Sequence, residues 1–252
     1  MSVNFYPLNT SKLTLILISY LRRTSILAVL LFAASAFAQR AGDDVVFGGL
    51  VYLDNNSKIT NASNSNSVYD VTSAGLSSTV HNVFTLVGSD LHMFTDNLAA
   101  ELVLGAPPTI KTSMYTPANV VNHAIYINQA ITSKAESPSL IAKYLYGTPA
   151  DKVRPYLGLG VNYTHFSNLT YDPQIKLLAS NGLAASPSWN PVFNTGLSYK
   201  PDPQWILSAS LTYIPLSTHT TMNGNAGIGP NSATSHLIID PIILGMSLGY
   251  KF

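Results

Sequence analysis

Residues 242–252 read IILGMSLGYKF, and this stretch decides the fold. Its apolar and aromatic side chains stand at every second position, namely Ile242, Leu244, Met246, Leu248, Tyr250 and Phe252. A period of two is the signature of a β-strand with one apolar face. About ten residues are enough for a tilted strand to cross the hydrocarbon layer of a membrane, and rings at one end of the apolar row match an interfacial aromatic girdle. Taken alone, the stretch also fits the last strand of a soluble β-sandwich.

Composition favours the membrane interpretation. The 252 residues are 46% hydrophobic and only 10% charged, whereas soluble domains carry about 25% charged residues. The formal net charge of +1 gives no reason to expect a nucleic-acid partner. Because the chain has no cysteine, disulfides, thiolate metal sites and cysteine nucleophiles are excluded.

The N-terminal segment predicts export. Arg22 and Arg23 precede the apolar run 26–32, and Ala36-Phe37-Ala38 follows it. A positive flank, a short apolar core and small residues at the end are typical of a secretory signal peptide. We therefore expect residues 1–38 to be a signal peptide and residues 39–252 to be one exported domain. A second apolar patch, residues 13–18, lies before this signal. Residues 1–21 are therefore either an extended n-region of the signal peptide or the product of a start codon assigned too early.

The exported part contains eight candidate strands. We place them approximately at residues 44–53, 79–94, 98–112, 138–146, 154–168, 190–200, 204–217 and 242–252. Short turns alternate with long polar connections along the whole series, and aromatic residues repeatedly end the apolar faces. Outer-membrane barrels have an even strand number, short periplasmic turns, long extracellular loops and aromatic girdles. The predicted fold is therefore all-β: an eight-stranded antiparallel transmembrane β-barrel in the bacterial outer membrane, surrounded by lipid.

Alternation also predicts which side chains point inward. The inward set is Lys143, Tyr156, Gly158, Gly160, Asn162, Asn194, Gly196, Ser198, Ser208, Ser210, Thr212, Ser247, Gly249 and Lys251. An eight-stranded barrel is wide enough only for side chains or one small ligand, so we do not expect a water-filled pore. Lys143 and Lys251 need partners such as Glu101, and a satisfied interior network is favoured over a transport role for these charges. In the second strand, Phe84 and Leu86 favour one face and Val87 and Leu91 the other, which suggests a bulge.

Four blocks of sequence resemble one family. They are residues 94–107, which begin FTDN, residues 154–164 (RPYLGLGVNYT), residues 214–218 and the stretch from Ile239-Asp240-Pro241 to the terminal GYKF. Together they resemble the outer membrane protein W (OmpW) family of small barrels over about residues 83–252. The resemblance implies a narrow barrel with an apolar interior near its extracellular end, which passes small hydrophobic molecules and has no catalytic activity.

The resemblance also suggests roles for single residues. Trp189 matches a tryptophan that lines the hydrophobic constriction, although an interfacial anchor is an equal alternative for it. Val103 stands where the family has a leucine in the same neck, a change that would open the neck slightly. We therefore expect Val103, Trp189, Tyr156, Glu101 and Lys143 to line the channel or its constriction. Tyr250 and Phe252 are implied to be the signal read by the outer-membrane insertion machinery.

Enzyme, metal and cofactor sites have little support. The six histidines show no metal-ligand spacing, no G-x-S-x-G motif is present, and Gly158-Leu159-Gly160 lacks the third glycine of a dinucleotide site. Two functions remain: a narrow channel for passive uptake or efflux of small hydrophobic molecules, or a structural barrel whose long loops recognise envelope, host or phage partners.

Overall fold

A computed structural model describes residues 39–64, 77–116, 125–173, 182–225 and 230–252. All fifteen strands of this part lie in one compact unit, residues 37–251. No helix among the described residues has the length and apolar character needed to cross a membrane. The signal peptide predicted for residues 1–38 lies outside the described residues.

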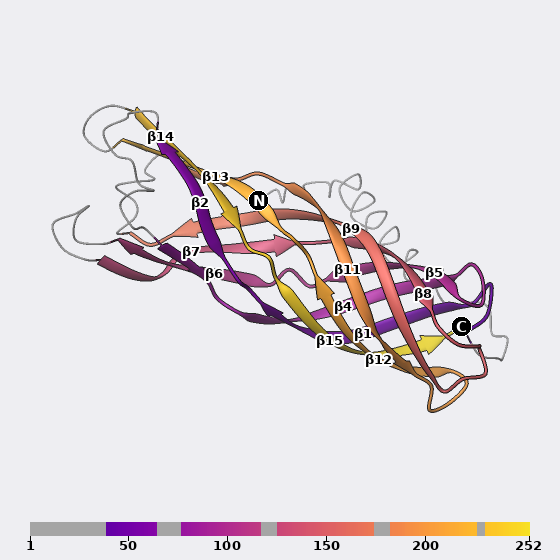
Figure 1. The fold of residues 1–252 in the computed structure, drawn as a ribbon. Coiled ribbons are helices and arrows are strands. Elements are labelled where there is room, and N and C mark those ends of the chain that lie inside the picture. The colour runs from indigo at the N-terminus through magenta and orange to yellow at the C-terminus, as the bar shows by residue number, and fades with distance from the viewer. Residues whose placement is uncertain (1–38, 65–76, 117–124, 174–181, 226–229) are drawn as a thin grey trace, which may run out of the picture. The chain divides into compact units, whose positions relative to one another are not determined.

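Eight strands form the wall of a closed barrel (Figure 1). They are β1 (Asp44–Asp54), β4 (Val83–Met93), β5 (Leu98–Gly105), β8 (Ser139–Leu145), β9 (Val153–Tyr171), β11 (Ser188–Tyr199), β12 (Trp205–Tyr213) and β15 (Ile242–Lys251). Each pairs antiparallel with the next, and β15 pairs with β1 from Val45 opposite Lys251 to Asp54 opposite Ile242. This pairing closes the sheet, so that no strand edge of the wall is left unpaired in lipid. The eight-stranded antiparallel prediction is confirmed.

The seven remaining strands extend the barrel beyond the long-loop end. They are β2 (Lys58–Asn64), β3 (Ser77–Val80), β6 (Thr109–Thr116), β7 (Ile125–Glu136), β10 (Gly182–Ala185), β13 (Ser217–Asn225) and β14 (Pro230–Ile238). β3, β6 and β7 continue the sheet from the outer part of β9, whereas β10, β13, β14 and β2 form a second sheet. The predicted long polar connections are therefore strands over these segments, because strand formation depends on pairing and packing context more than on intrinsic preference.

Several details of the predicted strands need correction. The second, placed at 79–94, is divided between β3 and β4, and the seventh, placed at 204–217, ends as β12 at Tyr213. The third does not continue to Thr112: β5 ends at Gly105, and Pro107 and Pro108 separate it from β6, because proline cannot donate to the ladder. The second needs no bulge, since β4 pairs with β1 in unbroken register from Val83 to His92. In β4, Phe84 and Leu86 point outward, whereas Val87 and Leu91 point inward.

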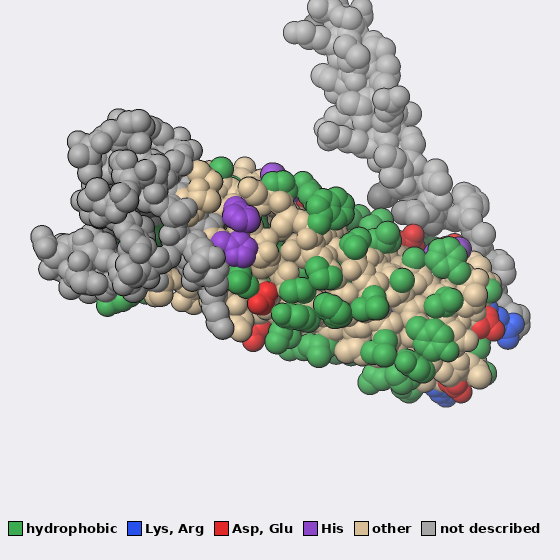
Figure 2. Space-filling view, turned by 45° about the horizontal axis from the view of Figure 1, so that its top comes forward, with side chains coloured by type: hydrophobic (Ala, Val, Ile, Leu, Met, Phe, Trp, Pro, Cys, Tyr) green, Lys and Arg blue, Asp and Glu red, His purple; other side chains and the backbone are tan. Residues whose placement is uncertain are grey.

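The outer surface is apolar and bounded by aromatic rings. Exposed leucines and valines such as Leu157, Leu159 and Val161 alternate with buried neighbours along β9, and Figure 2 shows hydrophobic side chains spread over the barrel wall.

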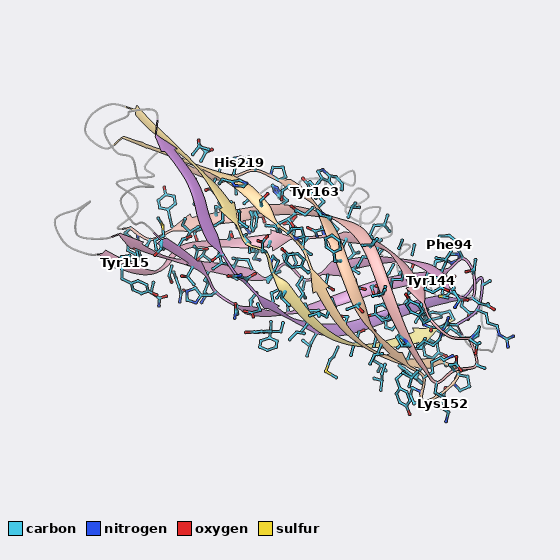
Figure 3. The ribbon with its side chains drawn as sticks, viewed as in Figure 1. Phe94, Tyr115, Tyr144, Lys152, Tyr163 and His219 are labelled. Atoms are coloured by element: carbon cyan, nitrogen blue, oxygen red, sulfur yellow. The ribbon has the colours of Figure 1, made fainter. Side chains whose placement is uncertain are left out.

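Aromatic side chains form a band at each end of this wall. The band near the short turns includes Phe94, Tyr144, Tyr146, Tyr199 and Trp205. Near the long-loop end, rings pair across neighbouring strands as Tyr52–Phe84, Tyr163–Trp189 and Phe193–Tyr213. On β11 the two bands stand ten positions apart, at Trp189 and Tyr199, which matches a tilted membrane-spanning strand. Figure 3 shows Phe94 and Tyr144 toward one end of the barrel and Tyr163 farther along it.

Candidate functional site

The short-turn end of the interior is closed by a packed apolar plug. Its side chains come from six strands and are all buried: Val45, Phe47, Leu91, Met93, Ala99, Leu145, Tyr156 and Ile206. They stand at the inward positions nearest the short turns. Buried side chains of this kind pack closely, so apolar groups fill the interior at this end.

Below the plug, Arg154 ties the short turns together. Its guanidinium is fully buried and donates hydrogen bonds to the carbonyl oxygens of Asp96, Leu145, Tyr146 and Gln39 at 2.6 to 3.4 Å. Asp96 belongs to the turn between β4 and β5, and Tyr146 to the turn between β8 and β9. One inward side chain therefore links the two turns and satisfies its donors with backbone carbonyls, as a buried guanidinium requires.

Above the plug lies a layer of buried polar groups. Lys143 Nζ forms an ion pair with Glu101 Oε2, and Ser89 Oγ donates a 2.6 Å hydrogen bond to Glu101 Oε1. Lys143 Nζ also lies 4.3 Å from the centre of the Tyr156 ring, and the Tyr156 hydroxyl is 3.3 Å from Ser208 Oγ. The buried charges therefore have partners, as the sequence suggested for Glu101 and Lys143. Lys251 pairs instead with Asp43, with 3.5 Å between Nζ and Oδ2.

The extracellular half of the interior is apolar and hollow. A cavity of about 170 Å³ stands on the polar layer, with Glu101, Lys143 and Tyr156 in its floor. A second cavity of about 70 Å³ lies among β3, β6, β7, β13 and the residues around them. Both are lined mainly by aliphatic and aromatic groups, many of them in one buried cluster with Ile141, Val192 and Ile214.

Four apolar side chains line both cavities, and we call this shared set the apolar ring. They are Val80, Ile110, Phe166 and Ile239, each at most 8% exposed. They come from β3, from β6, from β9 and from the residue just after β14. Phe166 continues the inward series of Tyr156, Asn162 and Thr164 along β9, so strand alternation was a sufficient signal for it. Val80 and Ile110 lay in the predicted strands 79–94 and 98–112, but each of these is broken in the structure, and alternation counted through the break gives the wrong face. Ile239 lay outside the predicted strands.

The predicted neck residues are placed differently from one another. Val103 is half-buried, packs against the apolar cluster and lines the larger cavity below the ring. Trp189 is 73% exposed on the outer surface, where its ring lies 4.9 Å from that of Tyr163. The constriction placement of Trp189 is therefore wrong. On β11 the inward positions are its neighbours, the buried Asn190 and Val192, and Trp189 stands in the outer aromatic band instead.

A polar network surrounds the cavity wall near β8 and β9. Asn162 Nδ2 donates to Ser139 Oγ at 2.9 Å, and Thr164 Oγ1 donates to Asn162 Oδ1 at 2.6 Å. Ser137 Oγ lies 2.7 Å from Thr164 Oγ1. These groups satisfy one another and tie β8 to β9 at the cavity wall.

One serine and one histidine meet on the extension. His81 Nε2 lies 2.7 Å from Ser113 Oγ, and Ser113 Oγ donates to Asn128 Oδ1 at 3.1 Å. A hydroxyl that gives its hydrogen to an amide oxygen is an acceptor toward the histidine, whereas an activated nucleophile would donate to it. Ser113 is also only 2% exposed. This contact has the geometry of a structural hydrogen bond. Among the described residues, no group of three His, Cys, Asp or Glu side chains could hold a metal ion.

Comparison with known proteins gives consistent matches. The outer membrane protein W of Vibrio cholerae serotype O1 is 28% identical over 231 residues, which cover 90% of this chain and 97% of that protein. The Pseudomonas aeruginosa protein named dibenzothiophene metabolism operon protein PahQ is 24% identical, covering 64% of this chain and 68% of that protein. The crystal structure of the outer membrane protein OprG from Pseudomonas aeruginosa superposes with a TM-score of 0.71 at 22% identity, covering 86% of this chain and 99% of OprG, which shows the same fold. The family model described as the OmpW family matches residues 41–252. This match agrees with the closed barrel and its apolar outer surface, and the chain is therefore an outer-membrane barrel that belongs to the OmpW family.

Proposed function

We propose that the barrel admits small hydrophobic molecules from outside the cell and passes them into its apolar interior. The observation that carries this proposal is the pair of adjoining apolar cavities in the extracellular half, joined at the ring of Val80, Ile110, Phe166 and Ile239. A ligand site is typically a concave, largely apolar space with a few polar groups in it. Apolar side chains supply most of the surface of the larger cavity, and Glu101, Lys143 and a number of Ser, Thr and Asn side chains supply the rest.

The size of the cavities limits the class of solute. An apolar cavity of about 150 Å³ holds one benzene molecule, so the cavity of about 170 Å³ suits a single ring or a short alkyl chain. Larger solutes would need both cavities and a displacement of the ring. Charged or strongly hydrated solutes are disfavoured, because the apolar lining does not replace the hydrogen bonds that they make with water.

One relative's name supports the same class of solute. PahQ is named for an operon of dibenzothiophene metabolism, and dibenzothiophene is a hydrophobic aromatic molecule. We transfer only the class, a small hydrophobic compound.

The ordered extension favours this function over surface recognition. Strands β3, β6 and β13 contribute inward side chains to the smaller cavity, including Val80, Ile110 and Thr218. The long connections therefore serve as walls of the apolar interior as well as an outer surface.

Uptake by proteoliposomes tests the proposal. Ile110→Gln places an amide in the ring at similar size, whereas Lys111→Gln introduces the same amide one position along, on the exposed face of β6. We expect the entry rate of a radiolabelled single-ring solute such as toluene to fall about tenfold in Ile110→Gln. An apolar solute beside the buried amide leaves that amide without a hydrogen-bond partner, at a cost of about 1–3 kcal/mol. In Lys111→Gln the entry rate should stay at the wild-type value.

Folding is checked by heat-modifiable gel migration and circular dichroism. Equal entry with and without the wild-type barrel would overturn the proposal, as would equal effects of the two substitutions. Solute recovered in the vesicle lumen indicates passage along the barrel axis, and this route requires the plug to move. Solute recovered only in the bilayer indicates a sideways exit through the barrel wall.

A further inference from the structure

The outer face of the second extension sheet carries a pair of histidines. His219 on β13 and His236 on β14 stand opposite each other in the antiparallel ladder, and their ring centres are 4.8 Å apart at an interplanar angle of 41°. Both point away from the cavity, because their neighbours Thr218, Thr220, Leu237 and Ile239 line it. Figure 2 shows histidine side chains together on the outer surface, and Figure 3 shows His219 beyond Tyr163 on the way to the long-loop end.

The backbone geometry brings these two side chains as close as a sheet allows. The carbonyl oxygen of His219 accepts a 2.9 Å hydrogen bond from the backbone nitrogen of Ser186, next to β10. Since the N–H and C=O of one strand residue point the same way, the polar groups of His219 face away from β14. The His219–His236 pair is therefore a non-hydrogen-bonded pair, the type with Cα atoms about 4.5 Å apart and the closer side chains.

A register shift further defines the position of His236. The pairing of β14 with β2 is irregular between His236 and Leu237. The extra residue is Thr60 of β2, which stands opposite the step from His236 to Leu237. Bulges are common next to functional sites, and this one lies beside the histidine pair.

We propose that His219 and His236 chelate a divalent transition-metal ion on the extracellular face. Imidazole suits Zn²⁺, Cu²⁺ and Ni²⁺. With a metal–nitrogen distance of about 2.0–2.1 Å, each ring centre lies roughly 3.2 Å from the ion, and centres 4.8 Å apart then subtend an angle of about 97°. This angle lies between those of octahedral and tetrahedral ligands, so the observed spacing fits two adjacent ligands once one nitrogen of each ring turns toward the ion.

Binding would have a structural consequence. An ion held by one residue from each strand joins β13 to β14 on the outer face, and the inner face of the same hairpin is a wall of the smaller cavity. The ion therefore stabilises the folded hairpin, since any ligand that binds only the folded form does so. This consequence does not depend on which solutes the cavity takes.

Direct binding tests the proposal on the full barrel, purified in detergent with a tag that contains no histidine. Titration calorimetry with Zn²⁺ is expected to give one ion per chain for the wild type. His219→Asn and His236→Asn should each weaken binding about 100-fold, because the second ligand acts at a high effective concentration once the first is bound. The control is His165→Asn, a change at another outward histidine on β9, which should bind as the wild type does.

A spectroscopic measurement identifies the ligands. The electron paramagnetic resonance spectrum of the Cu²⁺-loaded wild type should show splitting from two imidazole nitrogens, and that of either single variant from one. The proposal is overturned if the wild type binds no ion at about 1 mM, a free energy near −4 kcal/mol. It is equally overturned if the double variant binds as tightly as the wild type, or if only His165→Asn removes binding.

Discussion

Lys143 and Glu101 form an ion pair inside the barrel, with side chains only 6% and 9% exposed. They are diagonal neighbours across β8 and β5, since Lys143 stands opposite Ala99 and Glu101 opposite Ile141. The small Ala99 side chain leaves room for the lysine, and Ser89 and the Tyr156 ring supply further contacts. The pair therefore forms a rigid floor under the larger cavity.

Breaking this pair on one side should destabilise the barrel strongly. Glu101→Gln keeps the shape but leaves the Lys143 ammonium buried without a counter-charge, which typically costs about 3–5 kcal/mol. The double variant Glu101→Gln with Lys143→Met should recover at least about 1 kcal/mol of this loss, because it removes the uncompensated charge. The free energy of unfolding in urea, measured in lipid vesicles, is the test. Equal losses in the single and double variants would show that the charge itself is unimportant.

The turn between β8 and β9 gives a prediction about acid pH. The backbone N–H of Thr148 donates a 2.7 Å hydrogen bond to Asp151 Oδ2, and this bond, followed by that of the Thr148 side chain, lowers the pKa of Asp151 from its ordinary 3.8. A carboxyl with a lowered folded-state pKa stabilises the protein above its ordinary pKa and loses this effect as the pH falls through the folded-state value. The difference in unfolding free energy between the wild type and Asp151→Asn should therefore be constant above about pH 5 and shrink below about pH 4. A difference that stays constant from neutral pH into this acid range would contradict the assignment.

Two glycines on paired strands should respond oppositely to the same substitution. Gly249 stands opposite Phe47, and a Cβ at Gly249 would lie 2.4 Å from the Phe47 ring inside the plug. Gly249→Ala should therefore cost about 1–3 kcal/mol by overpacking. Gly48 faces outward with open space around its Cβ position, so Gly48→Ala should stabilise the strand by about 0.5–1 kcal/mol. Urea unfolding of both variants is the measurement, and a loss at Gly48 similar to that at Gly249 would refute the steric argument.

Strand alternation was enough to predict the wall of the barrel and the direction of its central side chains. The inward placement of Lys143, Tyr156, Asn162 and Lys251 follows from a period of two along each strand, because one face meets lipid and the other meets the interior. The family resemblance added nothing to these positions.

Strand alternation could not predict the extension strands or three of the four side chains of the apolar ring. Residues such as Ile110 and Ile239 belong to segments rich in Thr, Ser and Asn, where neither face is continuously apolar. Their strands depend on pairing between distant segments, as of β6 with β3 and β7, and such pairing is not encoded in local periodicity. For Trp189, the constriction and an interfacial anchor were equal alternatives, although the apolar outward residues Phe193 and Leu197 of β11 stand on the same face and favour the anchor.

The outward placement of Trp189 gives a prediction about transport. Trp189→Ala should leave the entry rate of the single-ring solute unchanged, because the side chain does not line either cavity. It should lower the unfolding free energy by about 0.5–1.5 kcal/mol, because an aromatic pair such as Trp189 with Tyr163 contributes about this much. Entry that falls as far as in Ile110→Gln would show that the outer band takes part in passage.

The terminal residue gives a prediction that separates assembly from stability. β15 ends at Lys251, so Phe252 adds no ladder residue to the wall, and we propose that its ring is recognised by the outer-membrane insertion machinery. Phe252→Asp should therefore reduce the amount of barrel in the outer membrane of expressing cells several-fold, while the same protein refolded into vesicles unfolds at the wild-type urea concentration. Met246→Asp is the contrasting control: Met246 is 74% exposed on the lipid-facing wall, where a charge in hydrocarbon destabilises the folded barrel itself. Its refolded form should unfold at lower urea. Normal membrane yield of Phe252→Asp would exclude a recognition role for the terminal ring. If refolded Phe252→Asp loses as much stability as refolded Met246→Asp, the lower yield results from a destabilised barrel and not from lost recognition.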